Sequence, residues 1–164
     1  MRRRSRDGGT FGPVGTAPRR GSVGDMIELR YEDIKVGAEA SLSRTITEAH
    51  IVMYAGLTGD VNPVHMDAEL AARSMFKERI AHGMLIAGLI SAVLGTELPG
   101  PNSIYLGQDL RFVAPVKIGD TVTIVVTVLE KRDDKRIIKL RTTASNQRGE
   151  SVIEGTAVMK KMGL

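Results

Sequence analysis

The sequence predicts an α+β fold in which one antiparallel sheet wraps around a single long apolar helix. Residues 83–95 contain no charged side chain, and a helix that is apolar on every face needs to be surrounded by other structure. Four long segments with strand character follow this helix, at about residues 103–113, 120–131, 135–146 and 150–160. These two observations together indicate a helix enclosed by a sheet.

The elements before the central helix follow from shorter patterns. A first strand is predicted by the alternating apolar residues Ala38, Ala40, Leu42 and Ile46. Thr47 is a plausible N-cap for a helix at about residues 48–57, which Gly56 and Gly59 would end. Its apolar stripe would consist of Ile51, Val52, Ala55 and Leu57. A short helix is expected at Asp67–Arg73.

Two polar segments are predicted to be hairpin turns between the late strands. They are Asp133-Asp134-Lys135 and Asn146-Gln147-Arg148-Gly149. The edge strands of such a sheet present unpaired backbone groups, so pairing with a second copy is expected. The protein is therefore predicted to be at least a homodimer.

The composition limits the classes of protein that this chain can belong to. With 164 residues, 4% aromatic residues and no Trp, it is expected to form one domain with an aliphatic core. The lack of Cys excludes a disulfide framework, a thiolate nucleophile and a cysteine zinc site, and fits a cytoplasmic protein. No apolar run reaches the ~20 residues that span a bilayer.

The formal net charge of +4 belongs to the N-terminal tail. Residues 1–25 contain six Arg against Asp7 and Asp25. Subtracting these from the 23 basic and 19 acidic residues of the whole chain leaves 17 of each in residues 26–164. The body therefore has no basic excess with which to bind nucleic acid.

Residues 1–25 are rich in Arg, Gly and Pro and are predicted to be disordered, ahead of a domain at 26–164. Three interpretations of this tail compete. In the first, the start of translation is assigned too far upstream and Met26 is the true first residue. In the second the tail is a mitochondrial presequence, and in the third it is an electrostatic arm. The first is favoured, because domain-like sequence begins directly after Met26.

The segment Gly59-Asp60-Val61-Asn62-Pro63-Val64-His65 carries the candidate chemistry. Its turn-forming residues bend the backbone, so the side chains of Asp60 and His65 can converge on one point. An aspartate and a histidine that meet in a cleft can hold and activate a water molecule. The alternative is an Asx-type turn in which Asp60 caps backbone N–H groups and His65 has only a structural bond.

This segment resembles the signature of the MaoC-like, (R)-specific enoyl-CoA hydratases. The resemblance covers about residues 27–160 and continues through Ile80-Ala81-His82-Gly83-Met84, Ser91, Ser103-Ile104-Tyr105-Leu106, Phe112, Pro115-Val116 and Gly119-Asp120. It implies a hot-dog fold, which is a sheet wrapped around a central helix. It also implies that Asp60 and His65 are catalytic, that Ser91 supports them, and that no metal is bound.

The remaining candidate residues have structural alternatives. Asn62, like Pro63, is expected mainly to shape the turn. Backbone N–H groups at Gly83 and Met84, at the start of the central helix, could bind a thioester oxygen, unless Gly83 only relieves crowding between helix and sheet. His82 is expected to bond a neighbouring loop. The hydroxyl of Ser91 could instead bond back to the carbonyl of Ala87.

The sequence therefore predicts a hydro-lyase that reversibly adds water to trans-2-enoyl-CoA and yields (R)-3-hydroxyacyl-CoA. The acyl chain is expected to contact residues of the central helix, from among Met84, Leu85, Leu89 and Val93. No glycine-rich phosphate loop occurs, so no cofactor is indicated. Three alternatives remain open: a (R)-3-hydroxyacyl-ACP dehydratase acting on acyl-carrier protein, a hot-dog thioesterase, and a non-catalytic thioester-binding subunit.

Overall fold

A computed structural model describes residues 28–163; the predicted tail at 1–25 lies outside them. A short 3-10 helix, η1 (Tyr31–Asp33), precedes the first strand, and the sequence did not predict it. The remaining elements are β1 (Glu39–Thr45), α1 (Glu48–Thr58), α2 (Pro63–Met66), α3 (Ala68–Arg73), α4 (Gly83–Thr96), β2 (Ser103–Phe112), β3 (Thr121–Arg132), β4 (Ile137–Ser145) and β5 (Ser151–Lys161). No helix among the described residues is long and apolar enough to cross a membrane.

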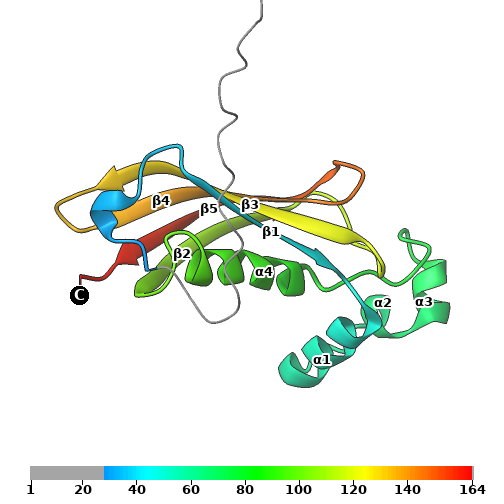
Figure 1. The fold of residues 1–164 in the computed structure, drawn as a ribbon. Helices are drawn as coiled ribbons and strands as arrows, with labels where there is room; N and C mark the ends of the chain where they lie inside the picture. The colour runs from blue at the N-terminus through cyan, green and yellow to red at the C-terminus, as the bar shows by residue number, and fades with distance from the viewer. Residues whose placement is uncertain (1–27, 164) are drawn as a thin grey trace, which may run out of the picture.

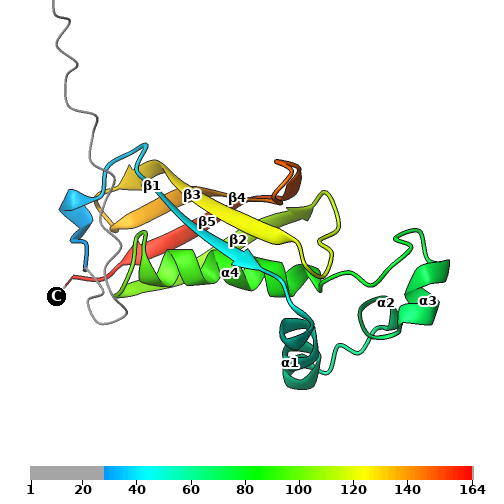
Figure 2. The ribbon, with the colours of Figure 1, turned by 45° about the vertical axis from the view of Figure 1, so that its right-hand side comes forward.

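The five strands form one antiparallel sheet in the order β1-β3-β4-β5-β2. The sheet curves over α4, which runs along its concave side (Figures 1 and 2). This is the predicted hot-dog arrangement, and the four predicted late strands agree with β2–β5 to within two residues at each end. The two predicted polar turns do connect β3 to β4 and β4 to β5. Strands β1 and β2 are the open edges.

The core lies between α4 and the sheet and is aliphatic, as the composition predicts. Fully or almost fully buried side chains on α4 include Ile86, Ile90 and Leu94. They belong to one cluster with alternating residues of the strands, among them Ile124 and Leu140. Inward apolar and outward polar side chains alternate along β4, which is the period expected for a sheet with one covered face.

One expectation for α4 is wrong within this single chain: the helix is not surrounded. Met84, Gly88, Ser91 and Gly95 are all exposed, and their spacing of three to four residues places them on one face of the helix. Five strands cover only the opposite face. This exposed stripe of α4 faces away from the sheet.

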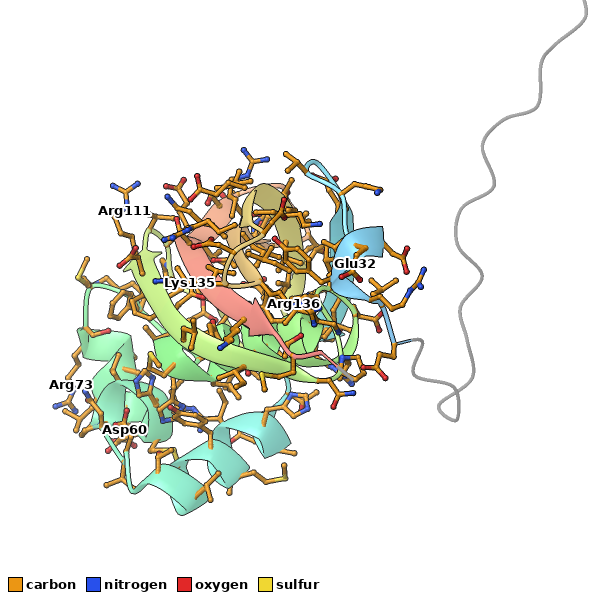
Figure 3. The ribbon with its side chains drawn as sticks, turned by 90° about the vertical axis from the view of Figure 1, so that its left-hand side faces the viewer. Glu32, Asp60, Arg73, Arg111, Lys135 and Arg136 are labelled. Atoms are coloured by element: carbon orange, nitrogen blue, oxygen red, sulfur yellow. The ribbon has the colours of Figure 1, made fainter. Side chains whose placement is uncertain are left out.

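Helices α1, α2 and α3 form a separate layer beside the N-terminal end of α4 (Figures 1 and 2). Helix α1 begins after Thr47, as predicted, but runs through Gly56 and ends only at Gly59, whose φ of 78° stops it. Figure 3 shows Asp60 in this helical layer, apart from Arg111 on β2. The layer brings the candidate turn to the start of α4.

Candidate active site

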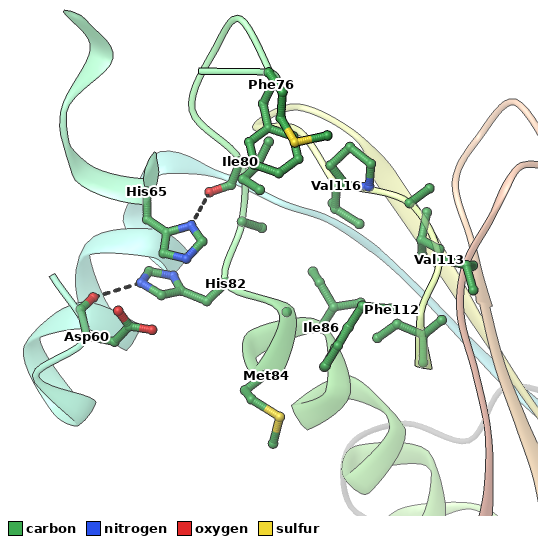
Figure 4. A pocket seen from close by; sticks show the side chains of 17 residues that line it. Asp60, His65, Phe76, Ile80, His82, Met84, Ile86, Phe112, Val113 and Val116 are labelled. Carbon is green, nitrogen blue, oxygen red and sulfur yellow. Dashed lines mark hydrogen bonds between the residues drawn. The ribbon is translucent and has the colours of Figure 1, made fainter. Parts of the chain in front are cut away.

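A pocket of about 490 Å³ lies where the turn after α1, the N-terminus of α4 and the β2–β3 loop meet (Figure 4). Its polar end is formed by Asp60, His65 and His82. The rest of the wall is apolar and comes from Met75, Phe76, Ile80, Ala81, Gly83, Met84, Ile86, Phe112, Val113, Ala114, Pro115, Val116, Val152 and Ile153. The shape suits a molecule with one reactive polar end and an apolar chain.

Asp60 follows the left-handed Gly59 and is held in a tight turn. The hydroxyl Oγ1 of Thr58 accepts from the backbone N–H of Asp60 at 3.2 Å, and the carboxylate of Asp60 accepts from the N–H of Asn62 at 3.3 Å. The residue is exposed within this chain, so one face of its carboxylate is open to the pocket. The Asx-type turn therefore forms without consuming the carboxylate.

His65 lies on α2, a short helix that sequence reasoning took for a continuation of the turn. The side chain of Asn62 accepts from the N–H of Val64 at 3.2 Å, and Pro63 occupies the first helical position, where its missing N–H costs nothing. These two residues are shape-givers, as predicted. The prediction failed to identify α2 because four residues are too few to show helical periodicity.

The ring of His65 has a defined tautomer. It is 9% exposed, and its Nδ1 lies 2.9 Å from the backbone oxygen of Ile80. A carbonyl oxygen can only accept, so Nδ1 carries the proton. In the neutral ring the lone pair is then on Nε2, which is the atom left to act as a base.

His82 contributes more to the site than the sequence indicated. As predicted it bonds a neighbouring loop: its Nε2 donates to the backbone oxygen of Asp60 at 2.9 Å. Its ring also lies between those of His65 and Tyr54, with centroid distances of 4.0 and 4.8 Å. It is 1% exposed, and its Nδ1 has no hydrogen-bond partner among the described residues. The only sequence signal was its position just before Gly83.

The three polar side chains offer acceptors rather than donors. One ligand-type atom from each of Asp60, His65 and His82 lies within 4.8 Å of the others. When both rings are neutral, the free imidazole nitrogens carry lone pairs, and the ionised carboxylate can only accept. A water molecule held by the Asp60 carboxylate and Nε2 of His65 would donate its two hydrogens to them and keep its oxygen lone pairs for the substrate.

The start of α4 offers the complementary donors. The N–H groups of Gly83 and Met84 have no hydrogen-bond acceptor among the described residues, as is usual for a first helical turn. A Cβ added to Gly83 would lie 2.8 Å from the ring of Phe112. Gly83 is thus required by packing against β2, which was the structural alternative, while its N–H remains available.

Within this chain, Ser91 and most of the predicted wall residues of α4 do not line the pocket. Ser91 lies eight residues after Gly83, a rise of about 12 Å along the helix axis, and is on the exposed stripe of α4. Of the four predicted wall residues on α4, only Met84 lines the pocket. Leu85 and Leu89 pack against the core and Val93 belongs to it.

The apolar wall comes mainly from segments far away in sequence, such as Phe112–Val116 and Val152–Ile153. Sequence spacing carries no signal for such a combination, since only the sheet order brings β5 and the β2–β3 loop to the start of α4. The pocket therefore brings Asp60, His65, His82 and the free start of α4 to one end of an apolar cavity.

The MaoC like domain family matches residues 32–149. The chain belongs to this family. It is 52% identical to an (R)-specific enoyl-CoA hydratase of Rhodospirillum rubrum over 138 residues, which cover 84% of this chain and 95% of the relative. The structure of the (R)-hydratase from Aeromonas caviae matches with a TM-score of 0.78 and 44% identity, covering 80% of this chain and 99% of that one. The structure of R-hydratase PhaJ1 from Pseudomonas aeruginosa matches with a TM-score of 0.76 and 46% identity, covering 82% of this chain and 87% of that one.

Proposed function

We propose that this MaoC-like protein is an (R)-specific enoyl-CoA hydratase, a hydro-lyase that interconverts trans-2-enoyl-CoA and (R)-3-hydroxyacyl-CoA. The observation that carries the proposal is the geometry of the polar pocket end, where Asp60 and His65 face the free start of α4 across one cavity. Relatives that are matched over nearly their whole length and bear this activity in their names support it.

The chemistry divides among three groups. The carboxylate of Asp60 and the Nε2 atom of His65 hold a water, remove its proton as its oxygen attacks C3, and deliver a proton to C2. The N–H groups of Gly83 and Met84 donate to the thioester oxygen, where negative charge develops as the enolate forms. The partial positive charge at the start of a 14-residue helix adds to this stabilisation. Every step uses the chain's own side chains and backbone.

The acyl-CoA enters with its thioester at the polar end and its acyl chain along the apolar wall. This wall includes Ile86, Val152 and Ile153. Aliphatic side chains of this kind bind an alkyl chain by burying its surface, at about 0.8 kcal/mol per CH₂ group. We therefore include a linear alkyl acyl group in the proposed substrate.

Mixing the protein with crotonyl-CoA tests the reaction type. A hydratase removes the enoyl absorbance without releasing thiol. A thioesterase would release free CoA, which a thiol reagent detects, and a binding subunit would do neither. Running matched CoA and acyl-carrier-protein thioesters under the same conditions separates the hydratase from an ACP dehydratase through kcat/KM.

We also propose that the protein works as at least a homodimer joined through the β2 edge. This edge strand carries the exposed apolar residues Ile104, Tyr105, Leu106 and Phe112. The exposed stripe of α4 lies beside it and is also apolar or small. A second copy would cover both surfaces at once. Light scattering at micromolar concentration should give at least twice the monomer mass, and a fully active monomer would contradict the proposal.

A further inference from the structure

The carboxylate of Asp120, just before β3, is buried and fully engaged although it lies outside the pocket. The residue is 4% exposed. Its Oδ2 accepts from the backbone N–H of Lys117 at 2.9 Å, and its Oδ1 accepts from Gln147 at 2.7 Å and Arg148 at 3.1 Å. Burial opposes the ionisation of Asp120, but these donors outweigh it and hold the pKa of the carboxyl below its ordinary value.

The bond from Asp120 to Lys117 fixes a loop that contacts the site directly. Lys117 forms an antiparallel bridge with Ile80, and the next pair along is closed by the bond from the N–H of Ala81 to the oxygen of Val116 at 2.7 Å. The backbone oxygen of Ile80 is the group that accepts from Nδ1 of His65. The position of the Asp120 carboxylate therefore determines where this acceptor lies.

A second connection runs through the backbone of Asp120. Its carbonyl accepts from the N–H of Ile46 at 2.8 Å, while the N–H of Gly119 donates to the oxygen of Ile46 at 2.7 Å. Ile46 directly precedes the Thr47 cap of α1, and the C-cap of that helix, Gly59, directly precedes Asp60. Both members of the dyad are thus attached to the same turn.

We infer that Asp120 is a positioning residue for the hydration reaction, holding the Ile80 carbonyl so that Nε2 of His65 points at the water. The inference rests on the proposed function. The N–H of Lys117 has no other acceptor among the described residues, so loss of the carboxylate removes one of the two bonds between Lys117 and Asp120. The remaining one, from the N–H of Asp120 to the oxygen of Lys117, is 3.1 Å long. A shift of about 1 Å in a catalytic group costs roughly 10²-fold in rate.

The principal test is Asp120→Asn, because an amide has one acceptor oxygen for three donors and must lose at least one bond. We expect kcat for crotonyl-CoA hydration to fall roughly 10- to 100-fold while KM stays within about twofold, since the effect is on orientation rather than on substrate contacts. The matched control is Lys161→Met. Lys161 is another buried charge, 1% exposed and bonded to the oxygens of Pro99 and Pro101 at the far end of α4.

A double-mutant cycle with His65→Gln shows whether Asp120 acts through His65. If it does, Asp120→Asn should lower the residual kcat of His65→Gln by less than about twofold, because the ring that it positions is already gone. Equal factors in the two backgrounds, or an equal loss of kcat in Lys161→Met, would overturn the inference. Near wild-type turnover in His65→Gln alone would instead contradict the proposed function.

Arg148→Met keeps the test usable if Asp120→Asn does not fold. The side chain of Arg148 is half exposed, so its replacement should be tolerated. The substitution removes one of the three donors to the Asp120 carboxylate and leaves the bond from Lys117 in place. We expect a smaller, few-fold fall in kcat that also disappears in the His65→Gln background. A few-fold fall that persists there would argue against positioning.

Discussion

The two ends of α4 differ in whether their main polar groups have hydrogen-bond partners. At its C-terminal end Lys161 donates to the carbonyls of Pro99 and Pro101, and the N–H of Gly100 bonds the oxygen of Leu94 at 3.1 Å. The Oγ of Ser103, in the strand that follows, is buried without a partner among the described residues. At its N-terminal end the N–H groups of Gly83 and Met84 and the Nδ1 of His82 have no partner among the described residues. Only the N-terminal end lines the cavity, so its free donors are the ones placed to meet a ligand.

The largest expected effect comes from removing the dyad at the unpaired end. Asp60→Asn and His65→Gln should each lower kcat by about 10²–10⁴-fold, the range for a positioned acid or base. Both side chains lie outside the α4–sheet core, so the melting temperature should change little. Steady-state kinetics with crotonyl-CoA and thermal melting of the same samples check this. Near wild-type turnover in either variant would mean that the active site does not lie at the N-terminal end of α4.

A smaller effect is expected at the helix start itself. Gly83→Ala places a Cβ 2.8 Å from the ring of Phe112, so this ring must shift from its place at the end of β2. The methyl group and the displaced ring should crowd the free N–H groups and lower kcat/KM by about 10-fold, comparable to a partly lost oxyanion donor.

The control for this steric effect is the double variant Gly83→Ala with Phe112→Ala. Removing the ring relieves the clash, so kcat/KM should return toward that of Phe112→Ala alone. If Gly83→Ala is as active as the wild type, the start of α4 does not bind the thioester oxygen.

The smallest effect on activity is expected at the paired end. Lys161→Met leaves the carbonyls of Pro99 and Pro101 without their donor, which should cost about 1–3 kcal/mol of unfolding free energy. Burial lowers the pKa of Lys161, so loss of a desolvated charge offsets part of that cost. Denaturant unfolding should show the loss while kcat stays unchanged. A fall in kcat as large as the loss expected for Gly83→Ala would show that the C-terminal end of α4 also matters for activity.

Most of the fold could be predicted because its signals are local. Residues 83–95 lack charge, and four strand-like segments with polar turns between them follow, so α4 and β2–β5 could be predicted from local patterns. Helix α2 and η1 were not predicted, since three or four residues are shorter than the repeat that would reveal them. Gly56 was wrongly taken as a helix end, because a single glycine inside a helix costs only about 1 kcal/mol and packing around Ile51 and Ala55 compensates.

The site was predictable where its residues are neighbours in sequence or begin a predicted helix, as Gly83 and Met84 do. Asp60, Asn62 and His65 lie in one turn, so their convergence follows from turn chemistry. Two contacts depend on how β2 and β3 are placed in space. They are the contact of Phe112 with Gly83 and the link from Asp120 through Lys117 to Ile80. The role of His82 likewise depends on ring stacking, which no spacing rule encodes.

The central claim is that water adds from the side of the enoyl group that faces Asp60 and His65, with the thioester held at the start of α4. Chiral analysis of the 3-hydroxybutyryl-CoA formed from crotonyl-CoA tests it most directly, because one fixed pose exposes only one face of C3. The account predicts (R)-3-hydroxybutyryl-CoA alone from the wild-type protein. A racemic product or the (S) enantiomer would contradict it.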